Sequence, residues 1–349
     1  MKALVLDKIG HIEYKDVADP EREAGSCLIK VKASGICGSD IPRVYKTGAH
    51  ILPIIPGHEF SGEVIKTDAG SAYKPGDRVG IFPLIPCKKC AQCQKKNYEM
   101  CRDYSYLGSR CDGGFAEYVS VPEWNLIKLP DHVSFEAAAM LEPLSVAAHA
   151  VRKATEGVDK NEEVFVYGQG TIGLFVDMIL LALGYKNITV ALNKDHQKTT
   201  AVKLGIKPER IIDSRQERAV DRIGKITCDI GSFISFDCIG KQDIVSDIIC
   251  MTAPGGRVML VGNPASDMGL SKDVYWKILR NQLTLLGTWN SSFTKDEGDD
   301  WHFVLELMGK GLIDPVKMIT HRFSLEDITD GFEIMRDKKE DYIKVMGII

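Results

Sequence analysis

Three glycines placed between an apolar strand and a helix constrain the fold of this chain more than any other feature. The segment 168–173 reads Gly-Gln-Gly-Thr-Ile-Gly and directly follows the apolar run 164–167. In such a turn the first glycine permits the tight bend, the second lets a pyrophosphate approach the backbone, and the third lets the helix pack on the sheet. The alternative is a purely structural turn, but the strand–turn–helix context and the free amides of the helix start favour dinucleotide binding. The predicted cofactor-binding residues of this turn are Gly168, Gly170, Thr171, Ile172 and Gly173.

Strand and helix patterns alternate along the chain from this turn onwards. We predict strands at 164–167, 188–192, 234–238, 257–261 and 283–286, and helices at 172–183 and 195–204. With a sixth strand in the set, this alternation is typical of a doubly wound parallel sheet covered by helices. We therefore predict a dinucleotide-binding domain at residues 144–288.

The segments outside that domain show short strands separated by turn sequences. We predict strands at 2–7, 27–33, 62–66, 78–82 and 116–121, divided by turns such as the Lys-Pro-Gly-Asp at 74–77. After residue 288 we predict a helix at 301–308 and a strand at 342–347, and we expect this tail to return to the first domain. The fold class is therefore α/β, with a β-rich domain made of residues 1–143 and 289–349.

Four cysteines with short spacings indicate a metal-binding lobe at residues 85–103. The intervals contain two, two and seven residues, and thiolates two residues apart bind one tetrahedral Zn²⁺ without strain. Because all four ligands are sulfur, no coordination position remains for substrate, and the ion is expected to be structural. The predicted ligands are Cys87, Cys90, Cys93 and Cys101.

Other uses of these cysteines fit less well. The segment 1–7 does not read as an export signal, so reduced thiols are favoured over disulfides. A ferredoxin-type cluster has a different spacing and a proline where Arg102 stands, and a nucleic-acid zinc ribbon has two separated knuckles. Four further cysteines lie in apolar sequence and are expected in the core: Cys27, Cys228, Cys238 and Cys250.

The size and charge of the chain exclude several classes of partner. A length of 349 residues favours about two domains, and a net charge of −4 gives no electrostatic case for binding nucleic acid. The most apolar stretch, 164–184, contains the glycine turn, Gln169 and Asp177, and therefore does not read as a membrane span. We expect a soluble, cytoplasmic protein without a nucleic-acid or membrane partner.

A second metal site is expected from four residues on three separate segments. Cys37, His58, Glu59 and Glu142 supply one thiolate, one imidazole and two carboxylates. Catalytic zinc keeps about three protein ligands and one open position. Cys37 and His58 are predicted as ligands, while Glu59 and Glu142 compete for the remaining place, directly or through water.

The end of the second predicted strand bears on the choice between NAD and NADP. An NAD site carries an acidic residue there for the ribose hydroxyls, whereas this chain has Asn193 followed by Lys194 and Asp195. Asn193 does not repel a 2′-phosphate, and Lys194 and Lys198 would attract one. We therefore predict NADP over NAD. In the alternatives, Asp195 serves an NAD ribose after a shift of the loop, or the lysines are only an exposed helix start.

Several motifs together give this chain a family resemblance that covers nearly its full length. The segments 35–40, 57–62, 75–79 and 113–118, the four-cysteine lobe and the glycine turn follow one another in family order. The chain resembles the zinc-dependent medium-chain dehydrogenase/reductases, and Glu142-Pro143 is similar to the acidic ligand of their polyol branch. The resemblance implies a GroES-like catalytic domain, a Rossmann domain, two zinc ions per chain, and a nicotinamide cofactor in a cleft between the domains. The implied reaction is hydride transfer between a polyol or polyol phosphate and NAD(P).

The resemblance also implies roles for residues around the second metal site. Ser39 is expected to carry the proton of the alcohol away from the substrate. Many relatives have a histidine five residues after the cysteine, where Pro42 stands here, so the proton is expected to leave through water or His50. Lys344 matches a position that contacts the cofactor pyrophosphate, although an exposed strand lysine is an equal alternative.

The substrate and the assembly are less constrained by the sequence. A phosphorylated substrate requires fixed cations, and the candidates are Arg43, Lys46 and Arg110. Two alternatives remain open, a secondary-alcohol or butanediol dehydrogenase with an apolar pocket, and a catalytically inactive member of the family. The resemblance implies a homodimer or homotetramer, formed through the sheet edge at 283–287.

Overall fold

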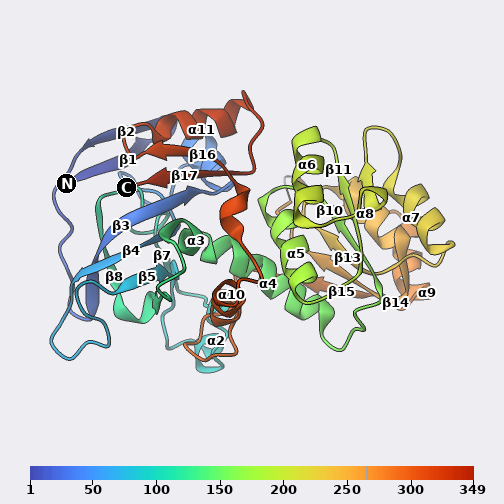
Figure 1. Ribbon diagram of the computed structural model, residues 1–349, viewed down its shortest axis with the longest axis horizontal. Helices are drawn as coiled ribbons and strands as arrows, with labels where there is room; N and C mark the ends of the chain where they lie inside the picture. The colour runs from blue at the N-terminus through green and yellow to red at the C-terminus, as the bar shows by residue number, and fades with distance from the viewer. Residues whose placement is uncertain (265) are drawn as a thin grey trace. The chain divides into compact units, whose positions relative to one another are not determined.

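The computed structural model describes residues 1–264 and 266–349, and the chain divides into two compact units (Figure 1). The first unit comprises Met1–Pro143 and Ser292–Ile349, and the second comprises Leu144–Ser291. The first unit is therefore assembled from both ends of the chain, with the C-terminal strands beside the N-terminal ones.

The first unit is built on a seven-stranded sheet in the order β16-β17-β3-β4-β5-β9, with β8 paired to β3. The strands of this sheet are β3 (Ser26–Ile36), β4 (Glu59–Lys66), β5 (Arg78–Ile81), β8 (Tyr118–Pro122), β9 (Leu126–Lys128), β16 (Ile319–Ser324) and β17 (Lys344–Ile348). Two small antiparallel pairs accompany it, namely β1 (Lys2–Lys8) with β2 (His11–Asp16), and β6 (Leu84–Ile85) with β7 (Ser105–Tyr106). The helices are α1 (Asp40–Pro42), α2 (Ala91–Gln94), α3 (Phe135–Ala139), α10 (Asp300–Gly309), α11 (Ile328–Asp337) and the start of α4 (Leu141–Thr155).

Alternating apolar residues on these strands build two core clusters. Leu4, Phe115 and Phe332 belong to the first, which packs around β1, β17 and α11. Ile29 and Phe60 belong to the second, between β3, β4 and the strands that follow them. These buried faces fix the register of the sheet, because a slip by one residue would turn every apolar side chain toward solvent.

Antiparallel pairing brings the ends of three strands to one edge of this sheet. The last residues of β3 lie opposite the first residues of β4 and β17, with Gly35 paired to Glu59 and Ile36 paired to Val345. Segments separated by about three hundred positions in the chain therefore meet at this edge. Most of the predicted catalytic residues lie on this edge.

The second unit is a six-stranded parallel sheet in the order β12-β11-β10-β13-β14-β15. Its strands are β10 (Glu163–Tyr167), β11 (Asn187–Leu192), β12 (Ile211–Asp213), β13 (Ser232–Asp237), β14 (Thr252–Leu260) and β15 (Thr284–Gly287). Its helices are α5 (Thr171–Ala182), α6 (Asp195–Leu204), α7 (Ala219–Thr227), α8 (Gln242–Met251) and α9 (Lys272–Arg280). The predicted doubly wound sheet is confirmed, and its sixth strand is the three-residue β12, for which no segment had been assigned.

One core prediction is wrong. Cys27 is buried, but Cys228 is exposed and ends α7 in a left-handed conformation with φ of 51°. Of its apolar neighbours in sequence, Ile223 is buried on α7, whereas Ile230 is 67 % exposed, so the apolar sequence does not mark a buried segment. Among the described residues, no helix combines the length and the apolar run that crossing a bilayer requires.

Candidate active site

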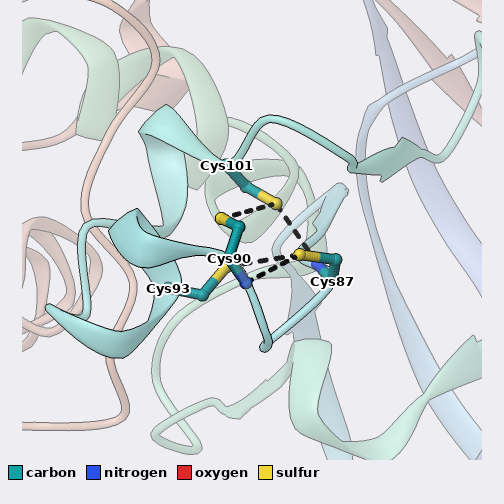
Figure 2. Close-up of side chains that lie close together, drawn as sticks. All are labelled: Cys87, Cys90, Cys93 and Cys101. Carbon is teal, nitrogen blue, oxygen red and sulfur yellow. Dashed lines mark hydrogen bonds between the residues drawn. The ribbon is translucent and has the colours of Figure 1, made fainter.

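The four cysteines of the lobe converge on one point (Figure 2). Cys87 Sγ and Cys93 Sγ lie 3.9 Å apart, Cys90 Sγ and Cys101 Sγ lie 4.0 Å apart, and all four sulfurs lie within 4.8 Å of one another. Zinc with Zn–S bonds of about 2.3 Å places its sulfurs about 3.8 Å apart in a tetrahedron. The donor set and its spacing therefore fit a structural zinc ion. Backbone hydrogen bonds from Arg102 and Cys93 lower the pKa of Cys90 to about 6, whereas burial raises the pKa of Cys93 to about 12.

The lobe packs on aromatic side chains of the first unit. The ring of Trp124 contacts Tyr98 of the lobe at a centroid distance of 5.0 Å and Phe293 of the C-terminal segment at 5.3 Å. Lys88 Nζ lies 4.7 Å from the Trp124 ring centroid, and Lys96 pairs with Asp296 at 2.9 Å. Lys96 thus connects the lobe to Asp296, and Lys88 connects it to Trp124.

A second group of potential ligands lies where β3 ends and β4 begins. Cys37 follows the last residue of β3, and His58 and Glu59 stand at the start of β4. Their ligand atoms lie within 4.8 Å of one another, and His58 and Glu59 are 4 % and 1 % exposed. A thiolate, an imidazole and a carboxylate are a donor set that zinc accepts in catalytic sites. The residues present therefore fit a metal ion at this place.

Asp40 supports this group and was not predicted from the sequence. Its carboxylate is fully buried, lies 3.3 Å from His58 Nδ1, accepts a hydrogen bond from the Cys37 backbone N–H at 3.0 Å, and pairs with Arg43. Burial would raise the pKa of Asp40, but the neighbouring His58 and Arg43 outweigh it and lower that pKa. A carboxylate on the second ring nitrogen is the usual device that fixes the tautomer of a metal-binding histidine.

The two candidate carboxylates have different surroundings. Glu59 forms an ion pair with Lys344, whose ammonium also donates to the carbonyl of Ile36 at 3.0 Å. Glu142, in the first turn of α4, accepts a hydrogen bond from the Tyr106 hydroxyl at 3.1 Å. Burial raises the pKa of Glu142 to about 7, although His58 opposes this. Among the described residues, the compact ligand group contains Glu59 and not Glu142.

Two predicted cationic residues form ion pairs with buried carboxylates. Lys344 is 2 % exposed, so the exposed strand lysine considered as an alternative is excluded, and its ammonium is held by Glu59 rather than presented to solvent. Arg43 is held by the buried Asp40, which leaves it supporting the His58 side of the site. Lys46 is exposed and makes no ion pair among the described residues.

Aromatic side chains that the sequence analysis did not single out extend from the ligand group. The ring of Tyr106 lies 5.7 Å from the His58 ring, and the ring of Tyr104 lies 6.3 Å from that of Tyr106. The guanidinium of Arg110 covers the Tyr104 ring at 4.5 Å. The Ser39 hydroxyl donates a hydrogen bond to Cys37 Sγ at 3.3 Å. Arg110 is thus connected to the ligand group by one cation–π contact and two edge-to-face aromatic contacts.

The glycine turn of the second unit has the predicted strand–turn–helix geometry between β10 and α5. Gly168 has φ of 99°, and a Cβ on Gly173 would lie 1.8 Å from the carbonyl oxygen of Gly168, so both positions require glycine. A Cβ on Gly170 would meet nothing within 4 Å, which leaves the backbone open to a ligand. Beside it lies a cavity of about 340 Å³, whose lining includes Gly168, Gln169, Gly170, Asn193 and Ser214. This cavity fits the adenosine and pyrophosphate end of a dinucleotide.

Asp177 lies fully buried in α5, below this turn. Burial raises its pKa well above the ordinary value of 3.8, and the amide of Gln169 offsets this only in part. The folded unit therefore holds the carboxyl in its neutral form, and the stability it contributes is lost as the pH rises through the raised pKa.

We expect the isosteric Asp177→Asn to stabilise the second unit in a pH-dependent way. The gain in unfolding free energy should be near zero at about pH 4 and reach at least about 1 kcal/mol at about pH 8, since the unfolded wild-type chain releases a proton that the folded unit retains. Chemical denaturation of both proteins across this range measures it. A gain that is constant with pH would contradict the assignment of a buried, titrating Asp177.

Each of the two units matches a known protein family. Residues 23–131 match the family model of the alcohol dehydrogenase GroES-like domain, and residues 171–309 match that of the zinc-binding dehydrogenases. The chain is 33 % identical over 334 residues to galactitol 1-phosphate 5-dehydrogenase of Escherichia coli K12, which covers 95 % of each chain. The chain is a zinc-dependent medium-chain dehydrogenase/reductase. This oxidoreductase is also 31 % identical to D-arabitol-phosphate dehydrogenase of Enterococcus avium, over 95 % of this chain and 92 % of that relative.

Solved structures of the family superpose over the whole chain. The crystal structure of galactitol-1-phosphate dehydrogenase from Escherichia coli matches this dehydrogenase with a TM-score of 0.92, 31 % identity and full coverage of both chains. A zinc-binding dehydrogenase of Sinorhizobium meliloti bound to NADP matches with a TM-score of 0.90 at 27 % identity, covering 100 % of this chain and 99 % of that one. An alcohol dehydrogenase of Escherichia coli CFT073 with NADH gives the same TM-score at 26 % identity and the same coverage. The chain therefore shares the fold of zinc-dependent dehydrogenases that bind a nicotinamide cofactor. Some of the solved structures contain NADP and others contain NADH.

Proposed function

We propose that this dehydrogenase oxidises a polyol phosphate of the galactitol 1-phosphate type to the corresponding keto sugar phosphate, with NADP as the acceptor. The observation that carries the proposal is the row of Tyr106, Tyr104 and Arg110 leading away from His58. A polyol phosphate has a reacting carbinol at one position and a dianion at its end. An arginine set apart from the metal ligands matches that separation, because its forked donors suit phosphate oxygens.

The chemistry assigned to the site follows from its residues. Cys37, His58 and either Glu59 or Glu142 would hold zinc, which supplies Lewis-acid stabilisation of the negative charge that develops on the substrate oxygen. Asp40 places a carboxylate 3.3 Å from His58 Nδ1, and the Ser39 hydroxyl, beside Cys37 Sγ, would accept the proton of the substrate alcohol and pass it to water. A bound nicotinamide ring would supply the acceptor for the carbinol hydrogen, which carries its electron pair with it as a hydride.

The same residues account for the environment in which this transfer takes place. His58, Glu59 and Glu142 are all buried, so their charges act in a medium of low polarity where electrostatic stabilisation is stronger than in water. Tyr106 orients Glu142 through its hydroxyl and presents its ring to His58. Tyr106 is therefore assigned a positioning role between the metal ligands and the substrate.

We expect a clear difference between phosphorylated and free substrates. Arg110→Gln should lower kcat/KM for galactitol 1-phosphate by about 10- to 100-fold, because the loss of a hydrogen bond to a charged group costs about 1.5–3 kcal/mol. It should leave the much lower kcat/KM for free galactitol unchanged. Steady-state kinetics with both substrates and both NAD⁺ and NADP⁺ measure this.

Arg322→Gln is the matched control for that assay, because Arg322 pairs with Glu136 on the surface of the same unit. It should resemble the wild type on both substrates. Equal specificity constants of the wild type for galactitol 1-phosphate and galactitol would contradict the phosphate preference, and a better turnover of 2,3-butanediol than of either would favour a secondary-alcohol dehydrogenase.

The preference for NADP rests on the charges at the end of β11. Asn193 is neutral and exposed, and Lys194 and Lys198 follow it at the start of α6. Asp195, the carboxylate considered as an alternative ribose ligand, pairs with Arg215 at 2.6 Å. A 2′-phosphate would therefore meet more positive than unpaired negative charge in this region.

A homodimer or homotetramer through β15 is the proposed assembly. This strand ends the parallel sheet, so its outer edge has unpaired backbone groups, and Leu285 on it is 39 % exposed. Trp289, Tyr275 and Leu279 are also exposed nearby in the chain, at 60 %, 56 % and 51 %. An open edge with large apolar side chains favours pairing with a second copy.

We expect Leu285→Lys to release single protomers. Sedimentation equilibrium should give the mass of one chain for this variant and a multiple of it for the wild type. The control is Leu312→Lys, since Leu312 is 53 % exposed and belongs to the first unit. A wild type that sediments as a single chain, or a variant that remains fully associated, would refute the interface.

A further inference from the structure

A compact charge cluster lies at the rim of the dinucleotide cavity, and the sequence analysis recognised only part of it. We call Asp195, Lys198, Asp213 and Arg215 the rim cluster. Arg215 Nε and Nη2 donate to the two carboxylate oxygens of Asp213 at 2.8 Å and 2.6 Å, and Nη2 also donates to Asp195 at 2.6 Å. Lys198 lies close enough to lower the pKa of both carboxylates. The neighbouring Asn193, Gln197 and Ser214 line the cavity itself.

The position of Asp213 gives this cluster a meaning for cofactor choice. Asp213 ends β12 and pairs in register with Leu192, the last residue of β11. A carboxylate at the end of β11 is what an NAD site uses to bind the ribose hydroxyls, and here that position holds Asn193. Asp213 therefore brings a carboxylate back to the same edge of the sheet from the adjacent strand. Its side chain is 11 % exposed, whereas that of Asp195 is 85 % exposed.

Both carboxylates accept hydrogen bonds from one guanidinium. The hydrogen bonds from Arg215 lower the pKa of Asp213 to about 2, so Asp213 is ionised at neutral pH and its charge is balanced only by its partners. The fork of Arg215 occupies both oxygens of Asp213, which leaves them poorly placed to accept bonds from a ribose. If this guanidinium were removed, the two carboxylates would lose their hydrogen-bonded cation at the rim where a 2′-phosphate would lie.

We propose that Arg215 is a specificity-determining residue for the cofactor, because it masks Asp213 and Asp195 and so allows a 2′-phosphate at this rim. The inference rests on the proposed use of NADP and adds the residue that permits it. A purely structural alternative is that Arg215 braces the end of β12 against the start of α6. A brace would support both dinucleotides alike, whereas a mask changes the affinity for one relative to the other.

Binding of NADPH and NADH to the zinc-loaded protein without substrate, followed by nicotinamide fluorescence, distinguishes these roles. Arg215→Ala should weaken NADPH and strengthen NADH, shifting the ratio of their Kd values by about 10-fold or more, the scale of losing a charge-assisted pair. Arg218→Ala is the control, since Arg218 is exposed three residues away and pairs with Asp247 at 3.4 Å. It should leave the ratio unchanged.

A double variant tests whether Asp213 is the residue that Arg215 masks. In Arg215→Ala/Asp213→Asn the gained affinity for NADH should disappear, because the unmasked carboxylate is gone. An unchanged Kd ratio in Arg215→Ala, or an equal weakening of both dinucleotides, would overturn the proposal in favour of a brace. A wild type that prefers NADH contradicts the proposed cofactor, while the shift caused by Arg215→Ala supports or overturns the role of Arg215 independently of that result.

Discussion

His58→Gln is expected to abolish turnover and to leave one zinc ion per chain instead of two. The imidazole of His58 is buried beside Cys37, and its Nδ1 lies close to the Asp40 carboxylate. We expect a glutamine amide at this position neither to bind the metal nor to form the same contact with Asp40. Losing the metal removes several kcal/mol of stabilisation of the substrate oxygen, and about 4 kcal/mol corresponds to about 10³-fold in kcat. Metal analysis and steady-state kinetics of the purified variant measure both effects.

The control for this variant is His11→Gln, because His11 is exposed on β2 and pairs with Asp7. It should retain two zinc ions and full turnover. A His58→Gln protein that still holds two zinc ions and keeps its activity would show that the metal is bound elsewhere. The unfolding transition of the variant should stay close to that of the wild type, which separates loss of chemistry from loss of fold.

Cys93→Ser is expected to have the largest effect on stability. Cys93 is 4 % exposed and its sulfur converges with three others, so a serine leaves the ion with an incomplete shell inside the lobe. Structural zinc supplies about 10–16 kcal/mol of apparent binding energy in small zinc domains, and we expect a loss of at least about 3 kcal/mol in the first unit. The contacts of the lobe with Trp124 should be lost with it, which tryptophan fluorescence reports.

The matched control is Cys228→Ser, which changes an exposed cysteine of the second unit. It should retain both zinc ions and the wild-type unfolding midpoint. Cys93→Ser should lose the lobe zinc and keep the other ion, the reverse of His58→Gln. If Cys93→Ser unfolds like the wild type, the four sulfurs do not hold a structural ion.

Much of the fold could be predicted from local sequence patterns. The glycines at 168–173 and the alternation after them predicted the parallel sheet, because each signal lies within a few residues and has one physical cause. The strand β12 had no such signal, since three residues are too short to show a period. Cys228 was misplaced for a similar reason, as an apolar neighbourhood in sequence does not determine which way a helix end points.

The active site was predicted unevenly. Cys37, His58 and Glu59 belong to short motifs, and the structure brings them together. The pairs that support them join distant positions: Glu59 meets Lys344 across 285 residues, and Tyr106 meets Glu142 across 36. No local pattern encodes such pairs, because they arise from strand pairing and burial. Asp40 and Arg43 were easier to predict, because the sequence itself shows an acidic residue three positions after Cys37, on a short helix.

The central claim is that this chain holds two zinc ions in chemically different sites. Anomalous X-ray diffraction from crystals of the protein, recorded on both sides of the zinc absorption edge, tests it most directly. The account predicts two peaks per chain, one among the sulfurs of Cys87, Cys90, Cys93 and Cys101 and one between Cys37 Sγ and the His58 imidazole. A single peak in the sulfur lobe, with none beside Cys37 and His58, would contradict it.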